Sequence, residues 1–199
     1  MKACEDIDGV VTASDDAEAQ ASTRLELERF LRDVEVRAYR IALLGLRDRD
    51  DALDAVQDAM WRLVHRYADR PRGEWRPLFY RILQNRVRDI QRRRRFRSGI
   101  LAIFAGRDAG DAHVEDTPAP AHVDPLEQAS AGNAMRALED ALASLPTRQR
   151  EAFVLRCLEG LDTAETAAAM GCTEGSVKTH YSRAVHRLRT LLGAHLGGD

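Results

Sequence analysis

The pattern of apolar positions predicts helices along most of the chain. Apolar residues recur every three or four positions over about 23–46, 51–67 and 77–95. This spacing places them on one face of an α-helix. The same period returns over about 132–196, divided into four shorter segments. No stretch alternates apolar and polar residues as a half-exposed strand does.

Two segments lack this period and divide the chain. Residues 1–22 are acidic, so we expect them to be disordered. Residues 98–131 contain prolines and glycines that break helical order and predict a linker. The expected fold is all-α. Two small helical domains, residues 23–97 and 132–199, would be joined by this flexible acidic linker.

The formal net charge is only -2, but basic and acidic residues are concentrated in separate segments of the chain. Residues 62–97 hold thirteen arginines and three acidic residues. Residues 107–130 hold six acidic residues and one arginine. Such blocks are typical of a polyanion-binding domain flanked by acidic segments.

Several classes of protein do not fit the sequence. No apolar run approaches the roughly 20 residues of a membrane span, and the N-terminus lacks the apolar core of a signal peptide. We therefore expect a cytoplasmic protein without membrane insertion. The three cysteines form no CxxC pair, so no metal site or cofactor is expected. The acidic residues of the basic segment are scattered, which disfavours an enzyme acting on nucleic acid, and nothing indicates a small-molecule substrate.

Residues 163–192 have the pattern of a helix-turn-helix. Asp162 and Glu165 form a predicted capping box that opens a short alanine-rich helix. A tight turn at Gly171 follows, and then a longer helix with a polar and basic front face. The N-terminal part of such a helix offers side chains to base edges in the major groove. The candidate DNA contacts are Ser176, Lys178, Thr179, His180 and Arg183.

The basic segment combines arginine with aromatic residues, as single-stranded DNA binding requires. Asn85 carries a donor and an acceptor, which suits it to reading the edge of an extruded base. For Trp75, base stacking and core packing remain open alternatives, whereas Phe79 is expected in the core. The candidate DNA contacts here are Arg72, Trp75, Arg76, Arg81, Asn85 and Arg88.

Several motifs resemble conserved regions of bacterial sigma factors. The C-terminal motifs resemble region 4: Leu145-Pro146, Phe153-Val154-Leu155-Arg156, Glu159-Gly160-Leu161 and Glu174-Gly175-Ser176-Val177-Lys178. The N-terminal motifs resemble region 2: Asp51-Ala52-Leu53-Asp54-Ala55-Val56-Gln57-Asp58 and Phe79-Tyr80-Arg81-Ile82-Leu83-Gln84-Asn85. Two such regions with only a linker between them resemble the extracytoplasmic-function (ECF) branch. The chain departs from the family at Leu78, where a tryptophan is usual, and at Thr166, where an isoleucine is usual.

The resemblance implies a non-enzymatic factor that binds core RNA polymerase and directs promoter-specific initiation. Residues 132–199 would anchor the minus-thirty-five element, and residues 23–97 would read and open the minus-ten element, with Asn85 in the pocket for its upstream part. The implied partners are core polymerase, promoter DNA and an anti-sigma factor. The implied polymerase-binding residues are Asp54, Gln57, Asp58 and Arg62.

The main alternative is a stand-alone regulator of the LuxR type, since these proteins share the Glu-Gly-Ser-Val-Lys pattern. Such a regulator needs a receiver or effector domain at its N-terminus. Residues 23–97 show no strands and no phosphoacceptor arrangement, which favours the sigma factor.

Overall fold

The computed structural model describes residues 8–104 and 130–196. Every regular element in these two ranges is helical, which confirms the all-α prediction. None of the helices in the described ranges is long and apolar enough to cross a membrane. Three helices form an N-terminal bundle: α1 (Asp8–Leu46), α2 (Arg49–Tyr67) and α3 (Arg72–Phe104). A C-terminal bundle contains α4 (Ser130–Ala143), α5 (Thr147–Phe153), the π-helical turn η1 (Val154–Leu158), α6 (Thr163–Met170) and α7 (Glu174–Leu196).

The core of the N-terminal bundle is built around one face of α3. Apolar side chains at helical spacing on α3 are buried against α1 and α2. On α2 the buried positions are mainly alanines, which allow the helix to approach its neighbours closely. The central residues of this core are Val34, Ala38, Ala55, Ala59, Leu63, Phe79, Leu83 and Val87.

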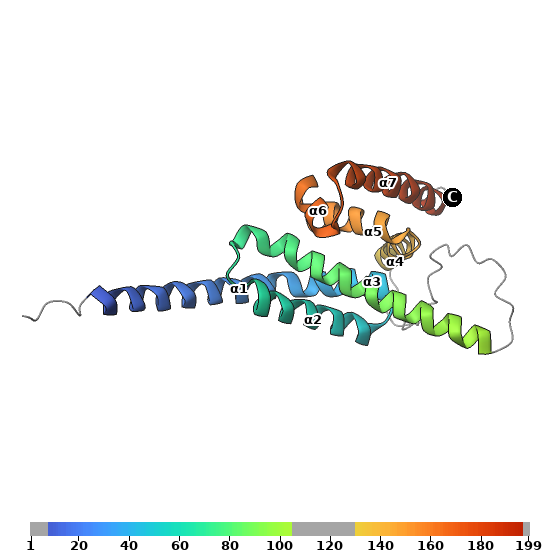
Figure 1. The fold of residues 1–199 in the computed structure, drawn as a ribbon. Coiled ribbons are helices and arrows are strands. Elements are labelled where there is room, and N and C mark those ends of the chain that lie inside the picture. The colour runs from blue at the N-terminus through green and yellow to red at the C-terminus, as the bar shows by residue number, and fades with distance from the viewer. Residues whose placement is uncertain (1–7, 105–129, 197–199) are drawn as a thin grey trace, which may run out of the picture.

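The helices at both ends of the N-terminal bundle are longer than predicted. Helix α1 begins at Asp8, not near residue 23, so the prediction of disorder for residues 1–22 is wrong from Asp8 onward. This stretch is rich in alanine, and extending an existing helix needs no new nucleus. Figure 1 shows it projecting beyond α2 and α3. Helix α3 continues to Phe104, so the predicted linker 98–131 begins as helix. Most of that linker, residues 105–129, lies outside the described residues.

The turn between α1 and α2 is held by charged side chains. Asp48 caps α2 by accepting a hydrogen bond from the backbone N–H of Asp51 at 2.9 Å. Arg94 of α3 donates to the carbonyl oxygen of Leu46 at 2.7 Å and pairs with Asp48 and Asp51. This arginine therefore ties the far end of α3 to the turn.

The C-terminal bundle has its own small core and a buried arginine. Leu142, Leu145, Ala184 and Leu188 pack together between α4 and α7. Arg150 donates to the carbonyl oxygens of Ala143 and Leu145 at 3.0 and 3.3 Å. Burial lowers the pKa of Arg150 to about 10, so the side chain stays charged at neutral pH. These bonds satisfy carbonyl groups that a helix end leaves without partners.

The two bundles pack against each other. Helix α6 lies against α3, and α4 lies against α1, so the C-terminal bundle covers one side of α3 (Figure 1). One continuous cluster of buried side chains runs from Ile41 and Val87 to Leu155 and Leu161. The free chain thus has a closed arrangement.

Sequence periodicity misplaced two residues near this contact. Helical periodicity over residues 147–158 predicts that Cys157 and Leu158 face inward, but both are exposed. They lie in η1, and a π-helical turn holds more residues per turn than an α-helix, which changes the facing of the residues in and after it. The buried position is instead taken by Glu159.

A glycine marks a close approach of α1 and α3. A Cβ atom on Gly45 would lie 2.9 Å from Val87 Cγ1, whereas a Cβ on Gly193 of α7 would meet nothing within 4 Å. We expect Gly45→Ala to lower the melting temperature, because overpacking costs about 1–3 kcal/mol, more than the roughly 1 kcal/mol gained in helix propensity. Gly193→Ala is the matched control and should raise it slightly. A Gly45→Ala protein that melts at or above wild type in a circular-dichroism scan would show that this contact is loose.

Candidate nucleic-acid interface

The helix-turn-helix is built as its sequence predicts. Asp162 Oδ1 accepts from the Glu165 N–H at 2.7 Å, and Glu165 Oε2 accepts from the Asp162 N–H at 2.8 Å, which completes the capping box. Gly171 ends α6 with a φ of 63°, a left-handed conformation that favours glycine. Thr173 Oγ1 accepts from the Ser176 N–H at 3.2 Å and caps α7. These bonds fix the angle at which α7 leaves the turn.

Helix α7 separates a packed face from a polar face. Val177, Ala184 and Leu188 are buried. The five candidate contacts lie on the other side, where Lys178, Thr179 and Arg183 are exposed and Ser176 and His180 are half-buried. Burial, followed by the charges of Arg148 and Arg183, lowers the pKa of His180, so its imidazole is neutral at pH 7. The neutral ring can both donate and accept hydrogen bonds.

Helix α3 presents Asn85 and Arg81 to solvent. Asn85 Oδ1 accepts a hydrogen bond from Arg88, one helical turn along the same face. Arg88 also reaches the C-terminal bundle, where its guanidinium lies 3.3 Å from Glu151 Oε2. Asn85 is thus held in place by an arginine that has a second, interdomain partner.

The prediction that Trp75 contacts DNA is wrong for this structure. Its side chain is 1% exposed, and its ring lies 6.0 Å from that of Phe30 at a tilted angle. Phe79, predicted in the core, is fully buried and meets Phe30 edge-on. The spacing of Trp75 and Phe79, one turn apart, places both on the packed face of α3.

A carboxylate from the C-terminal bundle enters the basic surface of α3. The Glu159 side chain is 0% exposed, and its Oε2 lies 3.4 Å from Arg37 Nε and 3.6 Å from an Arg76 guanidinium nitrogen. Both carboxylate oxygens are buried without a hydrogen bond. The Tyr80 hydroxyl lies close by and likewise lacks a well-formed hydrogen bond. Burial, then the contact of the hydroxyl with the Glu159 carboxylate and the negative charge of that group, raise the pKa of Tyr80, which therefore stays neutral.

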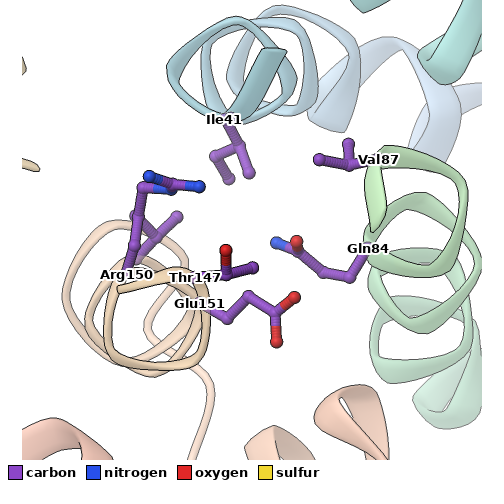
Figure 2. A pocket seen from close by; sticks show the side chains of 8 residues that line it. Ile41, Gln84, Val87, Thr147, Arg150 and Glu151 are labelled. Carbon is purple, nitrogen blue, oxygen red and sulfur yellow. The ribbon is translucent and has the colours of Figure 1, made fainter. Parts of the chain in front are cut away.

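The second carboxylate at this contact is Glu151 of α5. Its Oε2 accepts from Arg148 at 2.7 Å and from Arg88 at 3.3 Å. Burial raises the pKa of Glu151, although the neighbouring arginines oppose the shift. Figure 2 shows Glu151 and Gln84 facing each other across a cavity of about 10 Å³ between α3 and α5. Such a volume is close to the smallest that holds one water molecule.

One face of α2 is exposed and mixed in character. Asp54 and Gln57 are exposed, whereas Asp58 is half-buried and pairs with Arg62 at 3.2 Å and with Arg86 at 3.3 Å. Two of the four candidate polymerase contacts are thus engaged within the bundle.

Large apolar side chains share this face of α2. Leu53 is exposed, and Trp61 is 57% exposed with its ring stacked on His65 at 4.2 Å. Leu53, Gln57 and Trp61 are four residues apart and share one side of the helix. Helical periodicity alone predicts Leu53 on the buried face of α2, but alanines at 52, 55 and 59 occupy that face. Exposed apolar groups of this size commonly mark a contact with another protein.

Comparison with known proteins decides the family. Residues 135–188 match the family described as Sigma-70, region 4. SigD of Mycobacterium tuberculosis, an ECF RNA polymerase sigma factor, is 32% identical over 193 residues, 93% of this chain and 83% of SigD. The chain belongs to the ECF RNA polymerase sigma factors. A second ECF sigma factor, BldN of Streptomyces coelicolor, is 33% identical over 77% of this chain, although the match spans only 55% of BldN.

Solved structures of sigma factors share the fold. The sigma factor RpoE of Bartonella quintana, in complex with the anti-sigma factor NepR, superposes with a TM-score of 0.55 and 27% identity over 83% of this chain and 98% of RpoE. CnrH, solved with the cytosolic domain of CnrY, superposes with a TM-score of 0.56 and 22% identity over 89% of this chain and 94% of CnrH. The family and the arrangement of helices thus agree with the resemblance seen in the sequence, and the LuxR-type alternative is not favoured.

Sequence reasoning missed three residues of this ECF sigma factor that meet at the bundle contact. Arg37 lies on α1, outside the basic segment. Glu159 lies in a motif and Glu151 lies between two motifs, and neither position gave a reason to expect buried charge. Their positions depend on how the two bundles pack, which helical periodicity does not specify.

The burial of Trp75 can be measured directly, because the chain has two tryptophans of opposite exposure. The Trp61→Phe protein retains only Trp75, and we expect its emission to be blue-shifted and weakly quenched by acrylamide. The Trp75→Phe protein should show red-shifted emission and several-fold stronger quenching. Similar quenching of the two proteins would mean that Trp75 is accessible after all.

Proposed function

We propose that this ECF sigma factor binds core RNA polymerase and directs initiation at promoters read by both bundles. The N-terminal bundle reads and opens the minus-ten element, and the C-terminal bundle anchors the minus-thirty-five element. The observation that carries the proposal is the presence of a polar surface on each bundle. Exposed Asn85 lies among the arginines of α3, and the second helix of the helix-turn-helix presents an exposed polar face.

For the minus-ten element, the supporting residues are Arg72, Arg76, Arg81, Asn85 and Arg88. Arginine guanidinium groups bind phosphate oxygens with good geometry. The hydrogen bond from Arg88 to Asn85 Oδ1 leaves the amide nitrogen of Asn85 to meet a base edge. With Trp75 buried, stacking of bases on that indole is not part of the proposal.

For polymerase, we propose the exposed face of α2. Asp54 and Gln57 offer polar contacts beside the apolar surface of Leu53 and Trp61. Interfaces commonly combine an apolar centre with polar groups around it, and tryptophan often carries much of the binding energy. Asp58, which pairs with both Arg62 and Arg86, would hold this face in shape.

For regulation, we propose an anti-sigma factor as a further partner. The two structural neighbours were solved as complexes, RpoE with the anti-sigma factor NepR and CnrH with the cytosolic domain of CnrY. An anti-sigma factor that covered the exposed apolar residues of α2 would block access to polymerase.

The direct test is run-off transcription with purified core polymerase on fragments of the source genome. We expect the full chain to confer specific start sites that core alone does not use. A chain that binds DNA but leaves core without new start sites is a regulator of another kind, and the proposed function would then be wrong.

The recognition helix is tested separately. Arg183→Ala should weaken transcription from a minus-thirty-five-dependent promoter by about 10-fold, since a good base contact contributes about 1–3 kcal/mol. The matched control is Arg32→Ala on α1, which removes an exposed arginine far along the chain from α7. If the Arg183→Ala protein and the control both transcribed normally, Arg183 would not contribute to recognition of the minus-thirty-five element.

A further inference from the structure

The contact between the two bundles places carboxylates against the arginines assigned to DNA. Glu159 faces Arg76 of α3, and Glu151 faces Arg88 of α3. Arg37 of α1 completes the group around Glu159. All three arginines belong to the N-terminal bundle, whereas both glutamates belong to the C-terminal bundle.

Burial of the Glu159 carboxylate costs desolvation free energy. Its carboxylate has lost its water, and neither oxygen forms a hydrogen bond, so its compensation comes from ion pairs of 3.4 and 3.6 Å. Removing that charge would leave Arg37 and Arg76 without their partner, and loss of one member of a buried pair is destabilising. The ion pairs therefore hold the two bundles together, and a neutral side chain at position 159 would loosen the contact.

The apolar part of the contact is also imperfect. Ile41, Val87 and Val154 border the cavity shown in Figure 2, together with polar groups of Gln84 and Glu151. Voids and polar linings weaken packing relative to a close-packed core. A contact of this kind can open without unfolding either bundle.

A carboxylate and a phosphate present similar targets to an arginine. Both are oxyanions, and a guanidinium binds either one through charge-assisted hydrogen bonds. The positions of Glu151 and Glu159 therefore mark where backbone phosphates of DNA would lie along α3 and α1.

We propose that Arg37, Arg76 and Arg88 form a phosphate-binding surface for promoter DNA, which Glu151 and Glu159 occupy in the free protein. This inference rests on the proposed function. It adds Arg37 to the DNA-binding residues, and it makes closure of the bundles and DNA binding by the N-terminal bundle mutually exclusive. In the closed arrangement the side chains of Arg37, Arg76 and Arg88 are 46%, 39% and 30% exposed. Opening of the contact frees them from the carboxylates and moves the carboxylates away from the DNA path.

The test uses the full chain and a fluorescein-labelled oligothymidine of about 20 nucleotides, with binding followed by anisotropy at fixed salt. We expect Glu159→Gln and Glu151→Gln to raise the affinity about 10-fold, because each releases a surface that is largely occupied in wild type. Small-angle scattering should show a larger radius of gyration for both variants. The matched control is Glu139→Gln, which removes the same charge from an exposed position on α4 and should behave as wild type.

Arg37→Gln separates a phosphate contact from a purely structural role. It also breaks the pair with Glu159, so the radius of gyration should rise as in Glu159→Gln. Its affinity for oligothymidine, however, should stay several-fold below that of Glu159→Gln, because the phosphate partner is lost. Equal affinities for the two variants would show that Arg37 only holds the bundles together, and would overturn its place in the site.

The whole inference would be overturned if both glutamate variants kept the wild-type affinity for oligothymidine and the wild-type radius of gyration. It would also be overturned if their radius of gyration rose without a rise in affinity. If circular dichroism shows that Glu159→Gln does not fold, Glu151→Gln decides alone. Run-off transcription with wild type and core polymerase is measured on the same preparations. If wild type confers no specific start sites, the proposed function is refuted. If wild type transcribes normally but the glutamate variants keep the wild-type affinity and radius of gyration, only this inference is refuted.

Discussion

The structure depends on α3, a single helix whose sides serve different neighbours. One face is buried against α1 and α2 and forms the core of the N-terminal bundle. Another lies against α6 and receives the C-terminal bundle. The remaining surface is lined with arginine and carries Asn85. Because one rigid helix bears all three, the position of the C-terminal bundle determines which arginines are accessible.

Because the C-terminal bundle lies on the same helix as these arginines, its buried glutamates can pair with them. In most proteins a buried carboxylate is held by hydrogen bonds within its own domain. Glu159 instead depends on Arg37 and Arg76 across the contact, and Glu151 shares its charge between Arg148 of its own bundle and Arg88 of the other. The two bundles therefore satisfy each other's charges in the closed arrangement, and DNA would satisfy the same arginines in the open one.

Much of the fold could be predicted from sequence because helical periodicity and capping are local. The capping box at Asp162, the glycine stop at Gly171 and the core position of Phe79 follow from a few neighbouring residues. The family likewise followed from motifs that lie in short stretches. Trp75 was harder, since an aromatic residue in a basic segment suits either a base or a core, and only its packing against Phe30 distinguishes them.

The remaining errors have different causes. The first turns of α1 lack an apolar stripe, so a criterion based on burial overlooked a helix supported by alanine. The π-helical turn changed the facing of Cys157 and Leu158, which no periodic rule anticipates. Arg37 and Glu159 are 122 positions apart along the chain and meet because the bundles pack together. Such pairings are set by tertiary contact rather than by local pattern.

The central claim, that the bundles are closed in the free protein and open for function, is tested most directly by single-molecule energy transfer. Fluorophores on unnatural amino acids at Arg32 of α1 and Thr190 of α7, both exposed, would report the distance between the bundles. We predict one high-transfer population for the free chain and a shift to low transfer when core polymerase is added. A free chain that already shows the low-transfer population, unchanged by polymerase, would contradict this account.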